Sequence, residues 1–390
     1  MNSVLVTGGA HGDLPTIRAC KQLGYRVITG GNRPTDPGHR ESDDYVLFDY
    51  TDSDAVAEAA AANEVIGIVP SCHDSAAIAA AQAADALSLP GHDTPDVATR
   101  IHNKHLLRTT LQNCDIPTPR SISPTTPDEA SDWFKSLNGP AILKPSDLAG
   151  GRGVTRIDDA SQIKGAYKRA RELSPSRQII LEEFVVGRNH GVTILLRDQR
   201  PAFAFSDNEY YGINLFRVAG AYAPSTLATV NFMQICKYAS QFAQELSLVD
   251  GLLHLQVISG PTSISFIEAC RRPPGDFYPR LVQTATGYAY SKNITRGYLG
   301  LTVDQSHAFQ SNLPTIRHVL SADRSGLLKG FSIAKELRPF IIEMETWANV
   351  GDEIEDPLTW SGGVLLLQPP SSRLDDALSD ITELAYAVVN

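Results

Sequence analysis

Short apolar runs and segments of helical periodicity alternate along the first part of the chain. Runs rich in β-branched and aromatic residues predict strands at Ser3–Val6, Tyr25–Thr29, Tyr45–Phe48 and Val65–Pro70. Alanine-rich segments with helical spacing lie at Ala55–Ala62 and Ala76–Leu87. Continuous apolar strands separated by helices are typical of a parallel sheet that is covered on both faces. The pattern therefore predicts an N-terminal α/β domain over residues 1–98 with a doubly wound parallel sheet.

The pattern changes after a proline-rich stretch at residues 115–130, which is typical of a linker. Helical spacing predicts helices over Thr99–Asn113 and Thr229–Leu246. Short apolar runs without intervening helices predict strands at Ala141–Lys144, Val154–Ile157, Gln178–Phe184, Gly191–Leu196, Ala202–Ser206, Leu252–Ile258 and Ser263–Glu268. Such runs favour antiparallel pairing, so we expect an α+β region over residues 99–304.

The last part of the chain predicts a small strand-rich unit over residues 305–390. Candidate strands are Gly326–Ile333, Phe340–Thr346 and Gly363–Gln368, and the spacing over Leu374–Val389 predicts a closing amphipathic helix. The expected fold class is therefore a mixed α/β and α+β protein of three units. No internal repeat interrupts this order.

Composition and charge narrow the range of partners. The chain has 390 residues and a formal net charge of -10, and its Lys and Arg residues form no run. A protein that follows a nucleic-acid backbone usually presents a basic stripe, so we expect no nucleic-acid partner. No apolar run is long enough to span a bilayer, and the N-terminal residues lack a signal-peptide pattern. We expect a cytoplasmic protein with a small-molecule partner and no membrane contact.

The cysteines point to the same compartment. Five cysteines are scattered along the chain without CxxC spacing: Cys20, Cys72, Cys114, Cys236 and Cys270. An odd, scattered set fits neither a disulfide framework nor a zinc site, and it suits a reducing cytoplasm.

A glycine-rich turn is the first candidate for chemistry. Lys144 ends a predicted strand, and Gly150, Gly151, Arg152 and Gly153 follow it. Glycines let backbone N–H groups approach phosphate oxygens, and a lysine adds a point charge. Neither the Walker A ending nor the GxGxxG spacing is present. The turn predicts a phosphate-binding loop, with an ordinary glycine-rich hairpin as the alternative.

A second candidate is the end of a predicted strand that carries Glu182, Glu183, Phe184 and Val185. Its backbone and one carboxylate could face an adenine edge, with the two apolar side chains beside the ring. Taken alone, the segment fits an edge strand with solvated acidic residues better.

The third candidate is a pair of oxygen donors. Gln256 and Glu268 lie twelve positions apart at the ends of two strands that are predicted to pair. Each lies an even number of positions from its apolar neighbours, so both can face one side of the sheet. Such a pair could bind Mg²⁺ together with ATP phosphates. Arg271 and Arg272 could neutralise charge on a transferred phosphoryl group. A surface hairpin with a basic corner is the alternative.

Together, the order of phosphate loop, adenine segment, metal hairpin and arginine resembles the ATP-grasp superfamily over nearly the whole chain. The resemblance is strongest to carboxylate–amine ligases, which include amino-acid (dipeptide) ligases and purine-pathway ligases. The stretch Arg272–Gly287 (RPPGDFYPRLVQTATG) resembles the amino-acid branch. The resemblance implies an ADP-forming ligase that phosphorylates a carboxylate and joins the acyl-phosphate to an amine. It also implies ATP and Mg²⁺ as cofactors, with Mn²⁺ as a possible substitute.

The resemblance assigns roles by position. Lys104 and Lys144 match two nucleotide-contacting lysines, and Gly150–Gly153 matches the loop that closes over the β- and γ-phosphates. Glu182–Val185 matches the adenine hinge. Arg272 matches the arginine that stabilises the acyl-phosphate, with Arg271 as its neighbour.

Three positions depart from the family pattern. Gln256 and Glu268 match the metal ligands, although the first is usually a glutamate. Cys270 stands where an asparagine is usual, and it removes a hard oxygen donor. Asn189 stands in place of an acid that contacts ribose, and an amide can still bond a hydroxyl. The departures predict a less negative metal pocket.

Other residues are candidates for the substrate site. Arg280 follows the metal hairpin at the start of a predicted helix and is a candidate contact for a substrate carboxylate. Asp276 is a second candidate for contact with the substrate. His73 lies in a loop after a parallel strand, where ligands often bind. The segment Asp207–Arg217 could line the same pocket or form a plain surface loop. The turn Thr7–Gly12 could cradle a dinucleotide phosphate, although a lone glycine-rich turn is weak evidence.

Three hypotheses follow for the function. The first is a ligase that joins a small carboxylate, which we interpret as an amino acid, to a small amine. A ligase of the purine-pathway type is the alternative within this hypothesis. Such a ligase could be a homodimer. The second is a non-catalytic nucleotide-binding relative, because Gln256 and Cys270 depart from the pattern. The third is a dehydrogenase that uses the N-terminal sheet.

Overall fold

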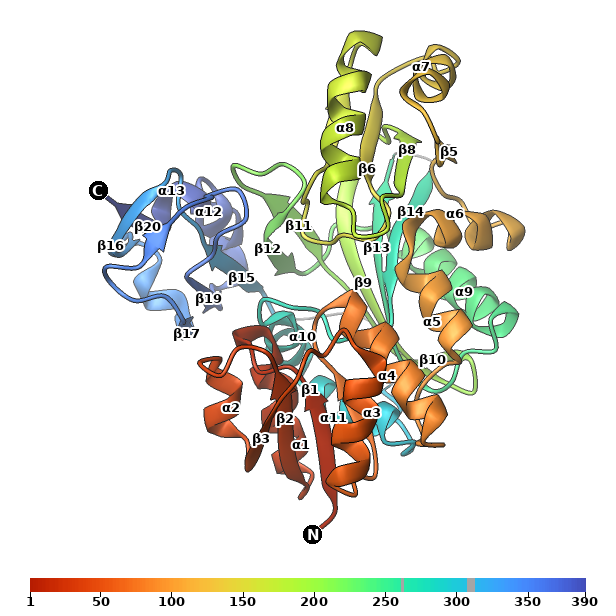
Figure 1. Ribbon diagram of the computed structural model, residues 1–390. Coiled ribbons are helices and arrows are strands. Elements are labelled where there is room, and N and C mark those ends of the chain that lie inside the picture. Colours follow the sequence, from red (N-terminus) through yellow and green to blue (C-terminus); the bar gives the residue numbers. More distant parts are fainter. Residues whose placement is uncertain (261–262, 307–312) are drawn as a thin grey trace.

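A parallel sheet forms the N-terminal part of the molecule (Figure 1). The computed structural model describes residues 1–260, 263–306 and 313–390. The strands of this sheet are β1 (Ser3–Thr7), β2 (Arg26–Gly31), β3 (Asp44–Leu47) and β4 (Ile68–Pro70). Their order is β3-β2-β1-β4, and every neighbouring pair is parallel.

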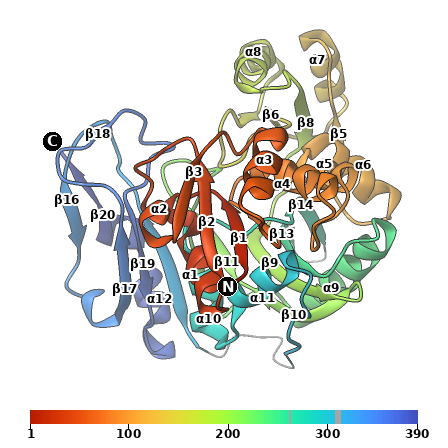
Figure 2. The same cartoon turned by 60° about the horizontal axis from the view of Figure 1, so that its bottom comes forward.

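Helices cover both faces of this sheet, as Figure 2 shows. On one face, Val4 and Val6 of β1 share a core with Ile17 of α1 (Leu14–Gln22) and with α10 (Tyr278–Thr286) and α11 (Tyr290–Tyr298). On the other face, Leu5 packs among residues of α3 (Ser53–Ala62) and α4 (Asp74–Ala86). The short helix α2 (Pro37–Glu41) follows β2. The predicted doubly wound sheet is therefore confirmed.

Two short helices replace the single helix that was predicted over Thr99–Asn113. The helices are α5 (Pro95–His102) and α6 (Lys104–Asn113), and the chain turns at Asn103. The Asn103 side chain accepts hydrogen bonds from the backbone N–H groups of His105 and Leu106, at 3.1 and 3.2 Å. Asparagine is a favoured N-cap because it satisfies these otherwise unpaired donors. The cap places Lys104 at the first position of α6, while the expected domain boundary at residue 98 falls inside α5.

Two antiparallel four-stranded sheets follow. The first has the order β5-β8-β6-β7 and the second β10-β9-β13-β14. The strands are β5 (Ser121–Ile122), β6 (Ala141–Pro145), β7 (Thr155–Ile157), β8 (Ile179–Glu183), β9 (Arg188–Arg197), β10 (Arg200–Ser206), β13 (Gly251–Ser259) and β14 (Ile264–Cys270). Helices α7 (Pro127–Lys135) and α8 (Ile163–Leu173) cover the first sheet, and α9 (Thr229–Glu245) packs on the second.

A third sheet joins the middle of the chain to the C-terminal unit. Its order is β11-β12-β15-β19-β17. The strands are β11 (Asn208–Tyr211), β12 (Val218–Ala223), β15 (Thr315–Leu320), β17 (Ile341–Thr346) and β19 (Gly363–Leu367). Figure 1 shows this sheet extending from the centre into the C-terminal unit. A small sheet of β18 (Glu353–Ile354), β16 (Gly326–Ile333) and β20 (Ala385–Val389) completes that unit.

The C-terminal segment is not the single helix that was predicted over Leu374–Val389. Two short helices, α12 (Leu374–Leu378) and α13 (Ile381–Leu384), are followed by strand β20. Asp380 has a positive φ of 54°, which interrupts the helix. Within β20, buried residues alternate with exposed ones, which is the period of a strand. The prediction took this alternation for part of a helical pattern.

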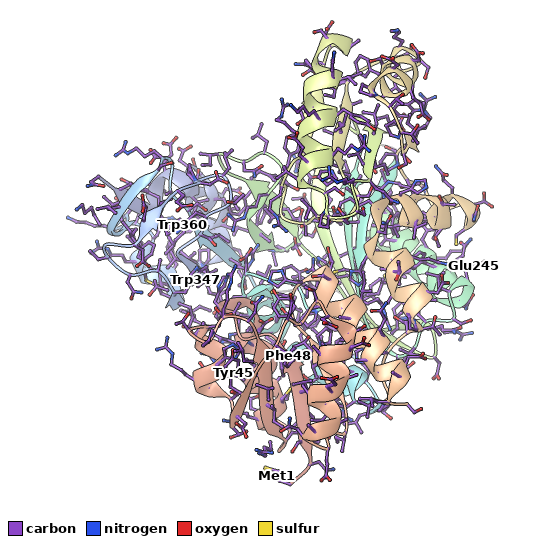
Figure 3. All side chains as sticks on the ribbon, in the orientation of Figure 1. Met1, Tyr45, Phe48, Glu245, Trp347 and Trp360 are labelled. Atoms are coloured by element: carbon purple, nitrogen blue, oxygen red, sulfur yellow. The ribbon has the colours of Figure 1, made fainter. Side chains whose placement is uncertain are left out.

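An aromatic contact joins the C-terminal unit to the N-terminal domain. The His11 ring stacks on Trp347 with centroids 3.6 Å apart. Figure 3 shows Trp347 on the side of the C-terminal unit that faces the N-terminal domain. Aromatic side chains contribute large contact areas to such interfaces. The stack places His11, in the turn after β1, beside residues that lie far away in the sequence.

A buried ion pair fixes the end of the N-terminal domain against the second antiparallel sheet. The Arg271 Nε atom lies 2.7 Å from an oxygen of Asp93, and both residues are buried. Two further guanidinium donors bond the backbone carbonyls of Leu252 and Val249. Arg271 therefore has a structural role in the interior.

We expect Asp93→Asn to lower the free energy of unfolding by about 3–5 kcal/mol, because a buried guanidinium would lose its counter-charge. Chemical denaturation of the purified chain measures the change. Asp96→Asn is the matched control, since its pair with Arg100 is largely exposed and should contribute less than about 1 kcal/mol. Equal losses in the two variants would contradict a structural role for the Asp93–Arg271 pair.

Candidate active site

The two predicted metal ligands lie opposite each other in the second antiparallel sheet. Gln256 in β13 is the cross-strand partner of Glu268 in β14. Cross-strand partners project to the same face of a sheet, which confirms the predicted juxtaposition. The Glu268 side chain keeps 35% of its surface exposed, so its carboxylate can reach a ligand.

A β-bulge lies beside this pair. The register shifts between Gln256 and Val257, and Ile267 is the extra residue on β14. A bulge leaves a backbone group of the ladder unpaired. Here the Ile267 carbonyl accepts a hydrogen bond from Nη2 of Arg108, at 2.6 Å. The bulge therefore connects the hairpin of β13 and β14 to helix α6.

Two buried lysines approach the pair from different segments. The Lys104 Nζ atom lies 3.2 Å from a carboxylate oxygen of Glu268 and donates to the carbonyl of Leu148 at 2.7 Å. The Lys144 Nζ atom lies 2.8 Å from an oxygen of Glu182. Both lysines are about 95% buried. The structure thus brings the first antiparallel sheet, α6 and the metal hairpin together at one place.

Glu182 belongs to this cluster through its side chain. Its carboxylate lies between Lys144 and Arg108, whose Nε atom is 2.7 Å away. Burial alone would raise the pKa of Glu182, but the two cations outweigh it and hold that pKa below its usual range. Burial lowers the pKa of Lys144, and Glu182 offsets part of that effect. The sequence did not single out Arg108, although its i+4 spacing from Lys104 places both on one helix face.

The glycine-rich turn connects β6 to β7. Gly150, Gly151 and Gly153 each have a φ of +71°, which residues with side chains rarely adopt. A Cβ atom on Gly151 would also come within 2.6 Å of the Phe216 carbonyl oxygen. Arg152, between these glycines, is exposed. The turn therefore has a backbone conformation that depends on its glycines, and its role as a phosphate-binding loop stays a prediction.

The predicted adenine segment splits by side-chain direction. Successive strand residues point to opposite faces, so Glu182 faces the lysine cluster and Glu183 faces away. The Glu183 carboxylate pairs with Arg120 at 3.3 Å and accepts the backbone N–H of that residue. The Glu182 carboxylate is committed to cations, so an adenine edge would meet the backbone of this segment. This differs from the expectation that a carboxylate would face the base.

The residues after β8 continue towards the second sheet. Phe184 lies under the guanidinium of Arg156, 4.4 Å from the ring centroid. Val185 is half-buried, and Asn189 in β9 is the cross-strand partner of Ile258. These positions connect the two antiparallel sheets and leave the ribose role of Asn189 a prediction.

Arg272 is held by an acid from the N-terminal domain. Its Nε atom lies 2.8 Å from an oxygen of Asp74, at the start of α4, and the same oxygen lies 3.0 Å from Nδ1 of His102. Burial would raise the pKa of Asp74, but Arg272 and His102 hold it well below its usual range. Arg271, the next residue back, points into the interior against Asp93. The structure therefore corrects the expectation that both arginines act together.

Arg280 also lies outside this cluster. Two of its donors contact one oxygen of Glu343 in β17, at 2.9 and 2.7 Å. That ion pair lines an open cleft formed by α1, α10 and α11. The carboxylate that Arg280 binds is thus one of the protein's own, which corrects its predicted role as a substrate contact.

The other predicted substrate residues lie where the domains meet. His73 is the N-cap residue of α4, beside Asp74, and its ring stacks on Tyr50 with centroids 5.9 Å apart. Asp276 lies 3.6 Å from Nε2 of His11. Burial would raise the pKa of Asp276, but its bond with His11 and nearby arginines lower it. The roles of both residues in substrate binding stay predictions.

Arg317 in β15 is a residue that the sequence did not indicate. Its Nη1 atom donates to the backbone carbonyl of Asp276 at 3.0 Å. The residue is only 3% exposed, and its Nε atom has no hydrogen-bond partner among the described residues. A buried donor without a partner is costly, so this atom is an unusual feature of the interior.

Two acids from the segment Asp207–Arg217 lie against strands of the second antiparallel sheet. Glu209 accepts a hydrogen bond from Nε2 of Gln256 at 2.9 Å. Asp207 lies over Gly191, where a Cβ atom would come within 2.6 Å of its carboxylate. Burial and the charge of Glu209 raise the pKa of Asp207 to about 8. Four of the eleven residues of this segment form strand β11 (Asn208–Tyr211), so its first part is not a plain surface loop.

The donor set suits a hard cation. Glu268 offers a carboxylate and Gln256 an amide oxygen, and magnesium prefers oxygen ligands. Among residues 1–260, 263–306 and 313–390, no three His, Cys, Asp or Glu side chains gather closely enough to hold a metal. A cation here would therefore need ligands from a bound phosphate as well, which the surrounding lysines and arginines could help to place.

Part of the sequence matches a known family model. Residues 103–269 match the family model "Carbamoyl-phosphate synthase L chain, ATP binding domain". This segment carries Lys104, Lys144, the glycine-rich turn, Gln256 and Glu268. This part of the chain is therefore similar to an ATP-binding domain, in agreement with the resemblance that the order of its segments indicated.

Curated relatives resemble part of the chain. The carbamoyl phosphate synthase large chain of Rubrobacter xylanophilus is 21% identical over 304 residues, which are 74% of this chain and 28% of that protein. The C-terminal section of the large chain from Methanopyrus kandleri is 22% identical over 74% of this chain and 54% of its own length. The chain thus spans roughly a quarter to a half of these relatives.

Solved structures share the whole fold. An L-amino acid ligase from Bacillus licheniformis superposes with a TM-score of 0.84 and 16% identity, over 100% of this chain and 98% of that one. Phosphoribosylglycinamide synthetase from Anaerococcus prevotii gives a TM-score of 0.77 with 18% identity, over 100% of both chains. The biotin carboxylase domain of a Hydrogenobacter thermophilus 2-oxoglutarate carboxylase, crystallised with MgADP and bicarbonate, gives 0.80 with 17% identity, over 99% and 90%.

The predicted fold class is confirmed by these superpositions. At such low identities the similarity establishes the fold alone. It does not show that this chain shares the substrates of the similar proteins. Within the described residues, no helix combines the length and apolar character that crossing a membrane requires.

Proposed function

We propose that this chain is an ADP-forming ligase that activates a carboxylate as an acyl-phosphate and joins it to an amine. One observation carries the proposal. Gln256 and Glu268 lie opposite each other on one sheet face, and Lys104, from a separate segment, contacts Glu268. Oxygen donors for a metal and buried cations for phosphates are the two requirements of phosphoryl transfer from ATP.

The nucleotide is proposed to lie between the two antiparallel sheets. Lys104 and Lys144 bind phosphate oxygens, and Gly150–Gly153 closes over the β- and γ-phosphates through its backbone N–H groups. The segment Glu182–Val185 receives the adenine along its backbone, and Asn189 bonds the ribose. The burial of both lysines supports this role, since a desolvated cation interacts more strongly with a phosphate than an exposed one.

Magnesium, or manganese in its place, is proposed to bind Gln256 and Glu268 together with the phosphates. A bound divalent cation would neutralise charge on the transferred phosphoryl group. The ion pair between Lys104 and Glu268 holds the carboxylate in place beforehand.

Arg272 is proposed to stabilise the acyl-phosphate. Its Nε atom is occupied by Asp74 and its Nη1 atom lies 3.4 Å from the Pro273 carbonyl. Among the described residues these contacts leave Nη2 for an anion. His73 and Asp276 are proposed to contact the substrates. Arg317 is proposed as a further substrate contact in place of Arg280.

Amino acids are the substrates that we propose. The stretch Arg272–Gly287 resembles the amino-acid branch of these ligases, and the fold superposes well on an L-amino acid ligase. A non-catalytic nucleotide-binding role is the second candidate, because Cys270 faces the site beside Arg272 where the family pattern has an oxygen donor.

ADP release tests the proposal. The purified chain is incubated with ATP, Mg²⁺ and pairs of amino acids, with bicarbonate as an alternative carboxylate. We expect ADP release that requires both substrates, a condensed product by mass spectrometry, and a hydroxamate when hydroxylamine replaces the amine. Binding of Mg-ATP without turnover for any pair would favour the non-catalytic candidate. Turnover with bicarbonate alone would reject amino acids as the substrate class.

A further inference from the structure

The hydrogen bond between Glu209 and Gln256 has a chemical consequence at the metal hairpin. Gln256 replaces the glutamate of the family pattern, and the two side chains differ in symmetry. A carboxylate offers two equivalent oxygens, whichever way it turns. A glutamine offers one oxygen and one NH₂ group, and the NH₂ group cannot bind a cation. A glutamine ligand is therefore useful only in one of its two orientations.

Glu209 decides that orientation. Its Oε1 atom lies 2.9 Å from Nε2 of Gln256. An ionised carboxylate only accepts hydrogen bonds, so the atom that faces it must be the NH₂ group. The amide oxygen then points away from Glu209. A glutamine or water in the place of Glu209 could accept or donate, and it would leave both orientations open.

Glu209 is itself held in place. Its other oxygen accepts a hydrogen bond from the hydroxyl of Tyr211, at 3.0 Å. Its backbone pairs with Ala221 in β12, within the sheet that continues into the C-terminal unit. Tyr211 is two residues away on the same strand, so both side chains lie on one face. Burial raises the pKa of Glu209, while the hydrogen bonds from Gln256 and Tyr211 favour the carboxylate form, as would a divalent cation nearby.

We propose that Glu209 is a positioning residue that fixes the Gln256 amide with its oxygen towards the metal. The inference rests on the proposed function, because it requires Gln256 to be a metal ligand. Groups that orient a metal ligand from behind typically change metal affinity by about 10- to 100-fold when removed.

Manganese binding tests the inference without turnover. Mn²⁺ affinity is measured by electron paramagnetic resonance in the presence of a non-hydrolysable ATP analogue. We expect Glu209→Gln to weaken Mn²⁺ binding by roughly 10-fold or more. In a Gln256→Glu background, the same change should weaken it by less than about threefold, because a carboxylate ligand needs no orienting partner.

Tyr211→Phe provides a second variant that keeps the carboxylate, and it should give a smaller loss that is also absent in the Gln256→Glu background. If Glu209→Gln does not fold, this variant carries the test. Equal losses in both backgrounds would overturn the inference, because they would mean that Glu209 is a ligand or a structural support. Absence of nucleotide-dependent Mn²⁺ binding in the unaltered chain would instead reject the proposed function, and the inference with it.

Discussion

Glu268→Gln is expected to lower kcat for ADP release on the order of 10²- to 10³-fold, the largest effect that we predict for one residue. The change keeps the shape of the side chain and removes the charge that a divalent cation needs. It also leaves Lys104 without its carboxylate partner at 3.2 Å. Both losses act where charge develops during phosphoryl transfer, so kcat should fall more than the affinity for ATP.

Steady-state ADP release with a substrate pair that supports turnover measures this effect. Glu41→Gln is the matched control, because it removes a glutamate that pairs with Arg18 at 2.7 Å in another part of the molecule. Its kcat should stay within about twofold, since exposed ion pairs contribute little. A near-normal kcat for Glu268→Gln would reject the metal assignment.

Arg272→Ala is expected to lower kcat to a similar extent, on the order of 10²-fold, with a smaller change in KM for ATP. The arginine is placed by Asp74 at 2.8 Å, and the contacts of its Nε and Nη1 atoms leave Nη2 for the proposed acyl-phosphate. Removing it takes away transition-state stabilisation and leaves nucleotide binding to the lysines.

Asp74→Asn separates contact from positioning. It keeps the Arg272 side chain but weakens its anchor, so a smaller loss of kcat is expected than for Arg272→Ala. Arg100→Ala, which removes an exposed arginine on α5, serves as the control for loss of a positive charge. If Arg272→Ala raised KM for ATP alone and left kcat intact, the residue would be a nucleotide contact.

Much of the fold follows from local patterns. The strand predicted at Gly326–Ile333 is β16, and the apolar runs of the N-terminal part form a parallel sheet. Strands buried on both faces are continuously apolar, which makes them visible without tertiary information. The closing helix was wrong because β20 alternates with period two over only five residues. So short a segment is ambiguous until the partner strand β16 is known.

The candidate site was predictable where strand geometry determines it. The spacing of Gln256 and Glu268 indicated that they share a face, and the observed register places them opposite each other. The same alternation should have separated Arg271 from Arg272, because adjacent residues on an extended segment point in opposite directions. The sequence could not show which of the two arginines would pair with the buried Asp93.

The sequence by itself determined the order of the segments that lie within the match to an ATP-binding domain. Only the tertiary structure decided which polar and charged groups meet: Arg272 with Asp74, Arg280 with Glu343, and Glu209 with Gln256. The physical reason is that each of these contacts joins segments from 47 to 198 residues apart. Local spacing fixes the direction of a side chain, but the partner that it meets depends on how separate sheets pack.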